Sequence, residues 1–100
     1  NKEGFEKHHM PADSTTDLPY GDGPCINMER SDHRLTASCG NSIEAQEYRE
    51  AQRQLVSEGK FKEALQMDID DIKDKFGDKY DKAIEELKEY TAKLELEGRI

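Results

Sequence analysis

Residues 61–77 read FKEALQMDIDDIKDKFG and show the clearest periodicity in the chain. Large apolar side chains recur there at steps of three and four, which is the spacing of one face of an α-helix. These residues are Phe61, Leu65, Ile69, Ile72 and Phe76. Gly77 follows the last of them, and glycine is common just after the end of a helix. The segment therefore predicts an amphipathic helix, whose solvated face is expected to carry the acids Asp68, Asp70, Asp71 and Asp74.

A second helix is predicted directly after Gly77. Asp78 can cap its start, because aspartate is a favoured N-cap residue. The helix is expected to run to about Gly98, with apolar positions at Tyr80, Ile84, Leu87 and Leu94.

A third helix is predicted before residue 61, ending at Gly59. Its apolar positions are Tyr48, Ala51 and Leu55. Asn41 and Glu44 have the spacing of a capping box, and Ser42 is an alternative cap. Short turns marked by glycine favour antiparallel neighbours, so residues 41–100 predict a three-helix antiparallel bundle.

Residues 1–40 differ from this helical part, because they hold all three prolines, both cysteines and all three histidines. Two short strands are predicted, around Phe5–Met10 and Cys25–Glu29, and residues 13–23 between them are rich in turn formers. A further helix is expected near Asp32, which can cap it and place His33 in the first turn. The predicted fold is α+β and mostly α: a two-stranded hairpin and a helix, then the bundle, in a single domain spanning 1–100.

The composition excludes some classes of function. The chain has 100 residues, with 15 Lys and Arg against 23 Asp and Glu, and a formal net charge of -8. No apolar run approaches the roughly 20 residues that span a bilayer, so a membrane span is excluded. The acidic balance also argues against a protein that coats nucleic acid nonspecifically, since that needs a broad basic surface. A chain that begins at Asn1 without a leader pattern is expected to be the C-terminal piece of a longer protein.

The three histidines are the strongest candidates for chemistry. His8 and His9 are adjacent, so on a strand they point to opposite faces and can share a site only at a strand end. Met10-Pro11 supplies such an end, because proline cannot continue a ladder. One imidazole can then bind a divalent metal while its neighbour acts as a base, and His33 can close the metal site from the other side. Two imidazoles suit Zn, Ni, Co or Mn, and Mg bound mainly through phosphate and water also fits.

Two other interpretations of these residues stay open. The histidines can be ordinary polar residues at a strand end and a helix start. A zinc site can also be drawn from Cys25, Cys39, His33 and one of His8 or His9, although the cysteine spacing is unlike the close pairs of structural zinc sites. The sequence does not decide whether the two cysteines pair.

Several stretches together resemble one family of nucleases. They include HHMPAD (8–13), GPCINM (23–28), DHRLTAS (32–38) and, further along, MDIDDI (67–72) and FGDKY (76–80). With Tyr48-Arg49 and Gly59-Lys60-Phe61, they make nearly the whole chain similar to HNH/endonuclease VII-type nuclease domains, the ββα-metal fold. The similarity is to the versions at the C-termini of bacterial polymorphic toxins, such as Rhs and contact-dependent inhibition proteins.

This resemblance implies metal-dependent cleavage of phosphodiester bonds in nucleic acid, in DNA rather than RNA. It assigns His8 and His33 as metal ligands and His9 as the general base that activates water. Arg34 is expected to hold a phosphate oxygen, and Asn27 to brace the loop of the motif. Members of the family often have a second histidine one turn further along the helix that carries the metal ligand. Here that position is Ala37, so water and phosphate would complete the metal's ligands.

Nucleic acid is expected to contact a local group of bases around the histidines, namely Lys2, Lys7, Arg30 and Arg34. The implied cofactor is a divalent ion, Mg, Mn, Ni or Zn. A toxin of this kind implies a secreted or delivered bacterial effector that acts in the target-cell cytoplasm, and a cognate immunity protein as partner. The alternative function is a non-enzymatic acidic helical module that binds a partner protein, with incidental histidines or a structural metal.

Overall fold

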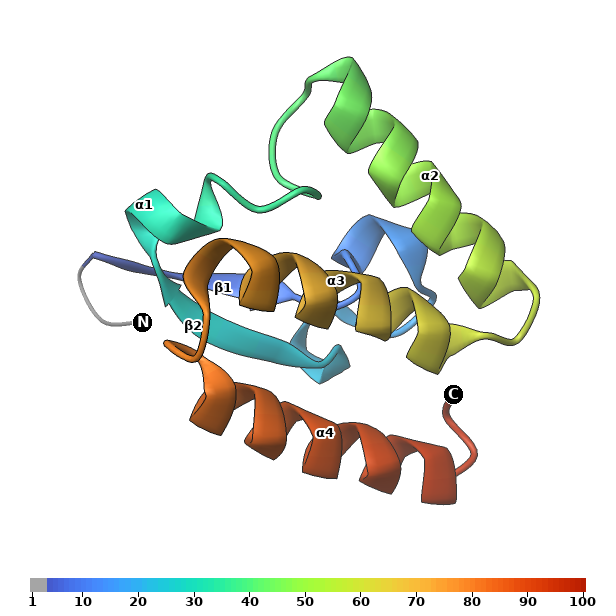
Figure 1. Ribbon diagram of the computed structural model, residues 1–100. Helices are drawn as coiled ribbons and strands as arrows, with labels where there is room; N and C mark the ends of the chain where they lie inside the picture. Colours follow the sequence, from blue (N-terminus) through green and yellow to red (C-terminus); the bar gives the residue numbers. More distant parts are fainter. Residues whose placement is uncertain (1–3) are drawn as a thin grey trace.

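The computed structural model describes residues 4–100 as two strands followed by helices (Figure 1). The strands are β1 (Phe5–His9) and β2 (Cys25–Glu29), joined by a loop with two short 3-10 helices, η1 (Asp13–Thr15) and η2 (Tyr20–Asp22). The α-helices are α1 (Arg30–His33), α2 (Ile43–Ser57), α3 (Phe61–Phe76) and α4 (Asp81–Leu96). The predicted α+β class, mostly helical with a two-stranded sheet, is therefore confirmed.

The two strands form an antiparallel hairpin whose register separates the histidines. His8 lies opposite Ile26, and His9 lies opposite Cys25. Directly opposed residues share a face of an antiparallel sheet. His8 therefore lies on the face of Ile26 and Met28, whereas His9 lies on the other face.

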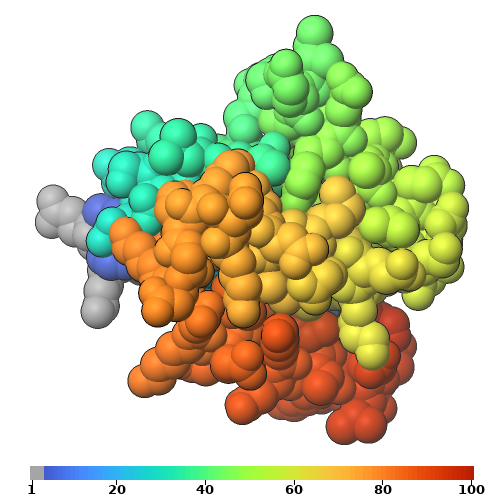
Figure 2. All heavy atoms as spheres, in the orientation of Figure 1, coloured from blue at the N-terminus to red at the C-terminus, as the bar shows by residue number. Residues whose placement is uncertain are grey.

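The first of these faces packs on α3 and α4, which run in opposite directions in Figure 1. One apolar core joins the hairpin to both helices, and it contains Met10, Ile26, Met28, Leu65, Ile69, Ile72, Tyr80, Ile84 and Leu87. In the view of Figure 2, α3 and the segment around α1 cover almost all of β1. The apolar stripes predicted for α3 and α4 thus face the core, and the sheet fills the space between these helices.

The buried face of α2 differs from the prediction. Ala51 is exposed, while Gln52 is fully buried. Asp68 is also fully buried, so the expectation that all four acids of α3 lie in water is wrong at this position. The cause is a polar contact between the helices, in which Gln52 Nε2 donates to Asp68 Oδ2 at 2.8 Å and Tyr48 Oη donates to Oδ1 at 2.8 Å.

The structure decides between the two predicted caps of α2 and overturns two other predicted helix caps. Ser42, not Asn41, caps α2, because its Oγ accepts a hydrogen bond from the backbone N–H of Ala45. Asp78 does not cap α4, which begins at Asp81 without a side-chain cap. Asp32 does not cap α1, which begins at Arg30, because its carboxylate binds side chains that precede α4 instead.

Within residues 4–100, no helix combines the length and the apolar character that a membrane crossing would need.

Candidate functional site

His8 is the most buried of the three histidines. Its side chain points into the sheet face that carries the core, and the residue is 2% exposed. Its Nε2 atom is buried and forms no hydrogen bond with the described part of the chain. Burial lowers the pKa of His8 to about 3, and the nearby charges of His33 and His9 act in the same direction. His8 is therefore a neutral imidazole with a free buried nitrogen, which is the form that binds metals.

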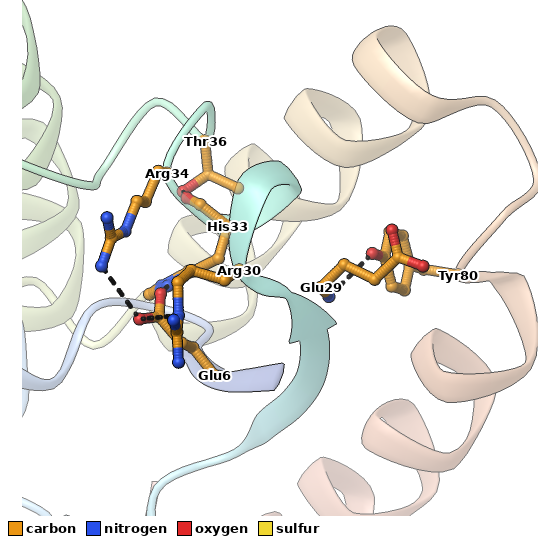
Figure 3. A network of polar contacts seen from close by, with 7 residues as sticks. All are labelled: Glu6, Glu29, Arg30, His33, Arg34, Thr36 and Tyr80. Atoms are coloured by element: carbon orange, nitrogen blue, oxygen red, sulfur yellow. Dashed lines mark hydrogen bonds and ion pairs between the residues drawn. The ribbon is translucent and has the colours of Figure 1, made fainter. Parts of the chain in front are cut away.

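His33 is oriented by a carboxylate from β1. Its Nδ1 lies 2.8 Å from Glu6 Oε1. Figure 3 shows the two side chains facing each other. A carboxylate accepts hydrogen bonds, so Nδ1 carries the proton in the neutral ring and Nε2 is left free. The hydrogen bond from His33 lowers the pKa of Glu6, and the charges of Arg34 and Arg30 add to the effect.

Glu6 was not anticipated from the sequence. It lies two residues before His8, and side chains at that spacing share one face of a strand. The two-residue repeat of a strand was therefore the signal in the sequence that could have identified Glu6. A carboxylate that orients an imidazole from behind is a frequent feature of metal-binding histidines.

The rings of His8 and His33 lie at a spacing that is compatible with a shared divalent metal. Their centres are 5.1 Å apart, with ring planes at 58°. Two imidazole nitrogens at about 2.1 Å from one tetrahedral metal put their ring centres about 5 Å apart. With the unpaired Nε2 of His8 and the free Nε2 of His33, the residues present fit such an ion as a pair of ligands.

His9 lies on the face of β1 opposite to His8, and one of its ring nitrogens has a hydrogen-bond partner. Its Nε2 lies 3.0 Å from the backbone oxygen of Tyr20, and its ring centre lies 4.5 Å from that of Tyr20. A carbonyl oxygen only accepts, so Nε2 carries the proton and Nδ1 is the basic nitrogen. Nδ1 is therefore the His9 nitrogen that can accept a proton, and the structure places this ring on the opposite face of β1 from His8.

The predicted basic residues do not all surround the histidines. Arg30 Nε lies 3.4 Å from Glu6 Oε2, and the Arg30 side chain is 54% exposed. A terminal nitrogen of Arg34 lies 3.5 Å from the same oxygen, and the Arg34 side chain is 65% exposed. Both therefore line the exposed rim beside His33. Lys7 lies on the face of His9 and is exposed. Lys2 lies outside the described residues.

Asn27 and Asp32 have different environments from those expected. Asn27 is exposed in a cleft of about 500 Å³ between β2 and α4, and its side chain makes no hydrogen bond to another residue of 4–100. Asp32 accepts hydrogen bonds from Lys79 Nζ at 2.6 Å and Tyr80 Oη at 2.7 Å, and these two bonds lower its pKa. Asp32 therefore attaches α1 to the start of α4.

The described residues hold no larger ligand cluster. Among residues 4–100, no three His, Cys, Asp or Glu side chains are grouped so that they could bind one metal ion. Cys25 and Cys39 are free thiols, each partly exposed. A metal at His8 and His33 would thus take its remaining ligands from water or phosphate, which is the arrangement expected from Ala37.

Comparison of the chain with protein-family models, with curated proteins and with solved structures finds no match.

Proposed function

We propose that this protein is a metal-dependent endonuclease that cleaves phosphodiester bonds of nucleic acid, with DNA as its main substrate. The observation that carries the proposal is the buried, unpaired Nε2 of His8 beside the ring of His33. Leaving a buried polar atom unpaired costs on the order of 1–3 kcal/mol. Coordination of a cation recovers that cost, which gives this nitrogen a role that a structural histidine would not have.

Each residue of the site has a distinct part in the proposed reaction. Nδ1 of His9 accepts the proton of the attacking water, because Nε2 is occupied by the Tyr20 carbonyl. Glu6 holds the His33 ring in place, and Arg30 and Arg34 bind phosphate oxygens by charge-assisted hydrogen bonds. His8 and His33 would hold a divalent metal, which would supply stabilisation of negative charge on the phosphate and on the leaving oxygen.

The net charge of -8 restricts how nucleic acid can approach. Phosphate binding depends on local cations, so contact is expected on the exposed rim formed by Arg30 and Arg34 rather than over a broad surface. We further propose that the protein is an effector delivered into the cytoplasm of a target bacterium. A cognate immunity protein would then cover this rim.

A cleavage assay tests the proposed activity. Supercoiled plasmid and a structured RNA are incubated with the purified protein and Mg²⁺, Mn²⁺, Ni²⁺ or Zn²⁺, with and without EDTA. We expect metal-dependent nicking of DNA that disappears with EDTA and with His9→Ala. His8→Ala is expected to lose both cleavage and metal affinity in calorimetry.

Lys88→Ala is a suitable control, because Lys88 is an exposed residue of α4 paired with Glu85. It should cleave like the wild type, and the helical circular-dichroism signal of all variants should be unchanged. Absence of cleavage of either nucleic acid with every metal would overturn the proposal and favour a protein-binding module. Full activity of His9→Ala would remove His9 from the mechanism.

A further inference from the structure

The helix that carries His33 is too short to fix its own position. α1 comprises four residues, Arg30–His33, and no side chain caps its N-terminus. One turn of helix fixes several backbone angles for very few hydrogen bonds, so it is unfavourable in isolation. The position of His33 must therefore be set by contacts from other parts of the fold.

The phenol of Tyr80 contacts both ends of the β2–α1 junction, and Figure 3 shows its contact with Glu29. Its hydroxyl accepts a hydrogen bond from the backbone N–H of Glu29 at 3.1 Å and donates one to Asp32 Oδ2 at 2.7 Å. Glu29 is the last residue of β2, and Asp32 directly precedes His33. One oxygen atom thus fixes where the strand ends and how the turn of helix is oriented.

Lys79 contacts the same two residues, but these contacts constrain the position of α1 less. Its Nζ lies 2.9 Å from Glu29 Oε2 and 2.6 Å from Asp32 Oδ2, while its side chain is 44% exposed. Exposed ion pairs contribute little and are mobile. The Tyr80 ring, by contrast, belongs to the apolar core and is 7% exposed, so its hydroxyl has a rigid attachment.

We propose that Tyr80 is a positioning residue, whose hydroxyl sets the His33 ring between Glu6 and His8. This inference rests on the proposed function, because it assigns Tyr80 a part in assembling that metal site. Glu6 binds the ring of His33 from β1, whereas Tyr80 fixes the backbone that carries it, and both are needed to define one ring orientation. Removing the Tyr80 hydroxyl frees α1 to rotate and weakens the contact between Glu6 and His33.

The test is Tyr80→Phe, which keeps the ring in the core and removes only the hydroxyl. The ¹⁵N chemical shifts of the histidine rings, measured with EDTA at a pH where the imidazoles are neutral, report the tautomer of each ring. We expect the wild-type His33 to be in the Nδ1–H form set by Glu6, and Tyr80→Phe to shift it toward a mixture with Nε2–H. The dissociation constant for Ni²⁺, measured by calorimetry, should rise about tenfold, as for the loss of other groups that orient metal ligands.

Tyr90→Phe is the matched control, because it removes a hydroxyl that donates to the backbone oxygen of Asp22 at 2.6 Å, away from α1. It should leave the His33 tautomer and the Ni²⁺ affinity unchanged. If Tyr80→Phe fails to fold, Asp32→Ala removes the Tyr80–Asp32 hydrogen bond, together with the exposed Lys79 contact, without altering the core and should shift the tautomer in the same direction. An unchanged His33 tautomer would overturn the positioning role. A shifted tautomer in a protein that binds no metal would support that role and overturn the metal site of the proposed function.

Discussion

The ring of His9 has very little free space on the side of Gly23. A Cβ atom added at Gly23 would lie 3.2 Å from His9 Cδ2, closer than an ordinary van der Waals contact. Gly23 has φ -70°, which any L-residue can adopt, so alanine there acts through the side chain alone. Gly23→Ala is expected to displace the imidazole by a few tenths of an ångström. Under the role proposed for His9, small errors in the position of the general base are costly, so cleavage should slow on the order of tenfold.

Gly21 provides the comparison, since a Cβ there would meet no atom within 4 Å. Gly21→Ala should cleave plasmid at the wild-type rate, and both variants should unfold within about 1 kcal/mol of the wild type in urea. Equal cleavage rates for the two variants would show that the position of His9 against the loop does not matter for the reaction.

At the scale of elements, the start of α2 gives a direct comparison of two candidate caps. Ser42 Oγ accepts the Ala45 N–H at 3.0 Å, whereas only the backbone oxygen of Asn41 is used, by Gln46 Nε2. Ser42→Ala should lower the free energy of unfolding by about 1 kcal/mol, the usual cost of losing an N-cap. Asn41→Ala should change it much less in the same urea titration. The reverse order of the two effects would place the helix start at Asn41.

The elements themselves were largely predictable, because apolar period and glycine stops are local signals. The stripe from Phe61 to Ile72 is buried as expected, and β2 has the predicted bounds. The buried face of α2 was not predictable in this way. Gln52 and Asp68 are polar, so hydropathy assigns both to water, and only their mutual contact across two helices makes burial favourable.

The candidate site shows the same division between local and distant information. The end of β1 at His9 follows from Pro11, and the predicted approach of His33 to His8 is seen in their ring contact. The partners that fix their ring orientations come from elsewhere in the fold, namely Glu6 for His33 and the backbone of Tyr20 for His9. A backbone carbonyl has no sequence signature, so the tautomer of His9 could only be found from the structure.

For the molecule as a whole, Asp68 belongs to a buried network that connects three separate segments. Gln52 donates to Asp68 and to the backbone oxygen of Ala64, and its Oε1 accepts the backbone N–H of Ala12 just after β1. Burial raises the pKa of Asp68 to about 7, and the charge of Asp71 adds to this, while the hydrogen bonds from Gln52 and Tyr48 oppose it. The junction of α2, α3 and the β1 loop therefore contains a carboxyl that titrates near neutral pH.

The sign of the resulting pH dependence follows from proton uptake. The folded pKa of Asp68 is above the ordinary value of 3.8, so between these values the folded state binds more protons than the unfolded state. The contribution of Asp68 to stability is thus present at low pH and is lost as the pH rises toward 7. Relative to Asp68→Asn, the wild-type free energy of unfolding should fall by about 1.4 kcal/mol per pH unit between roughly pH 4.5 and 6.5.

Urea titrations of both proteins in EDTA at several pH values measure this difference, and subtraction cancels every other titrating group, His8 included. Asp70→Asn is the control, because Asp70 lies two residues further along α3 on its exposed side and should leave the pH dependence close to that of the wild type. If the free energy of unfolding changed with pH in the same way in the wild type and in Asp68→Asn, Asp68 would be charged throughout this range. The network would then be a permanently ionised junction, and the attachment of α2 to the rest of the fold would not respond to pH near neutrality.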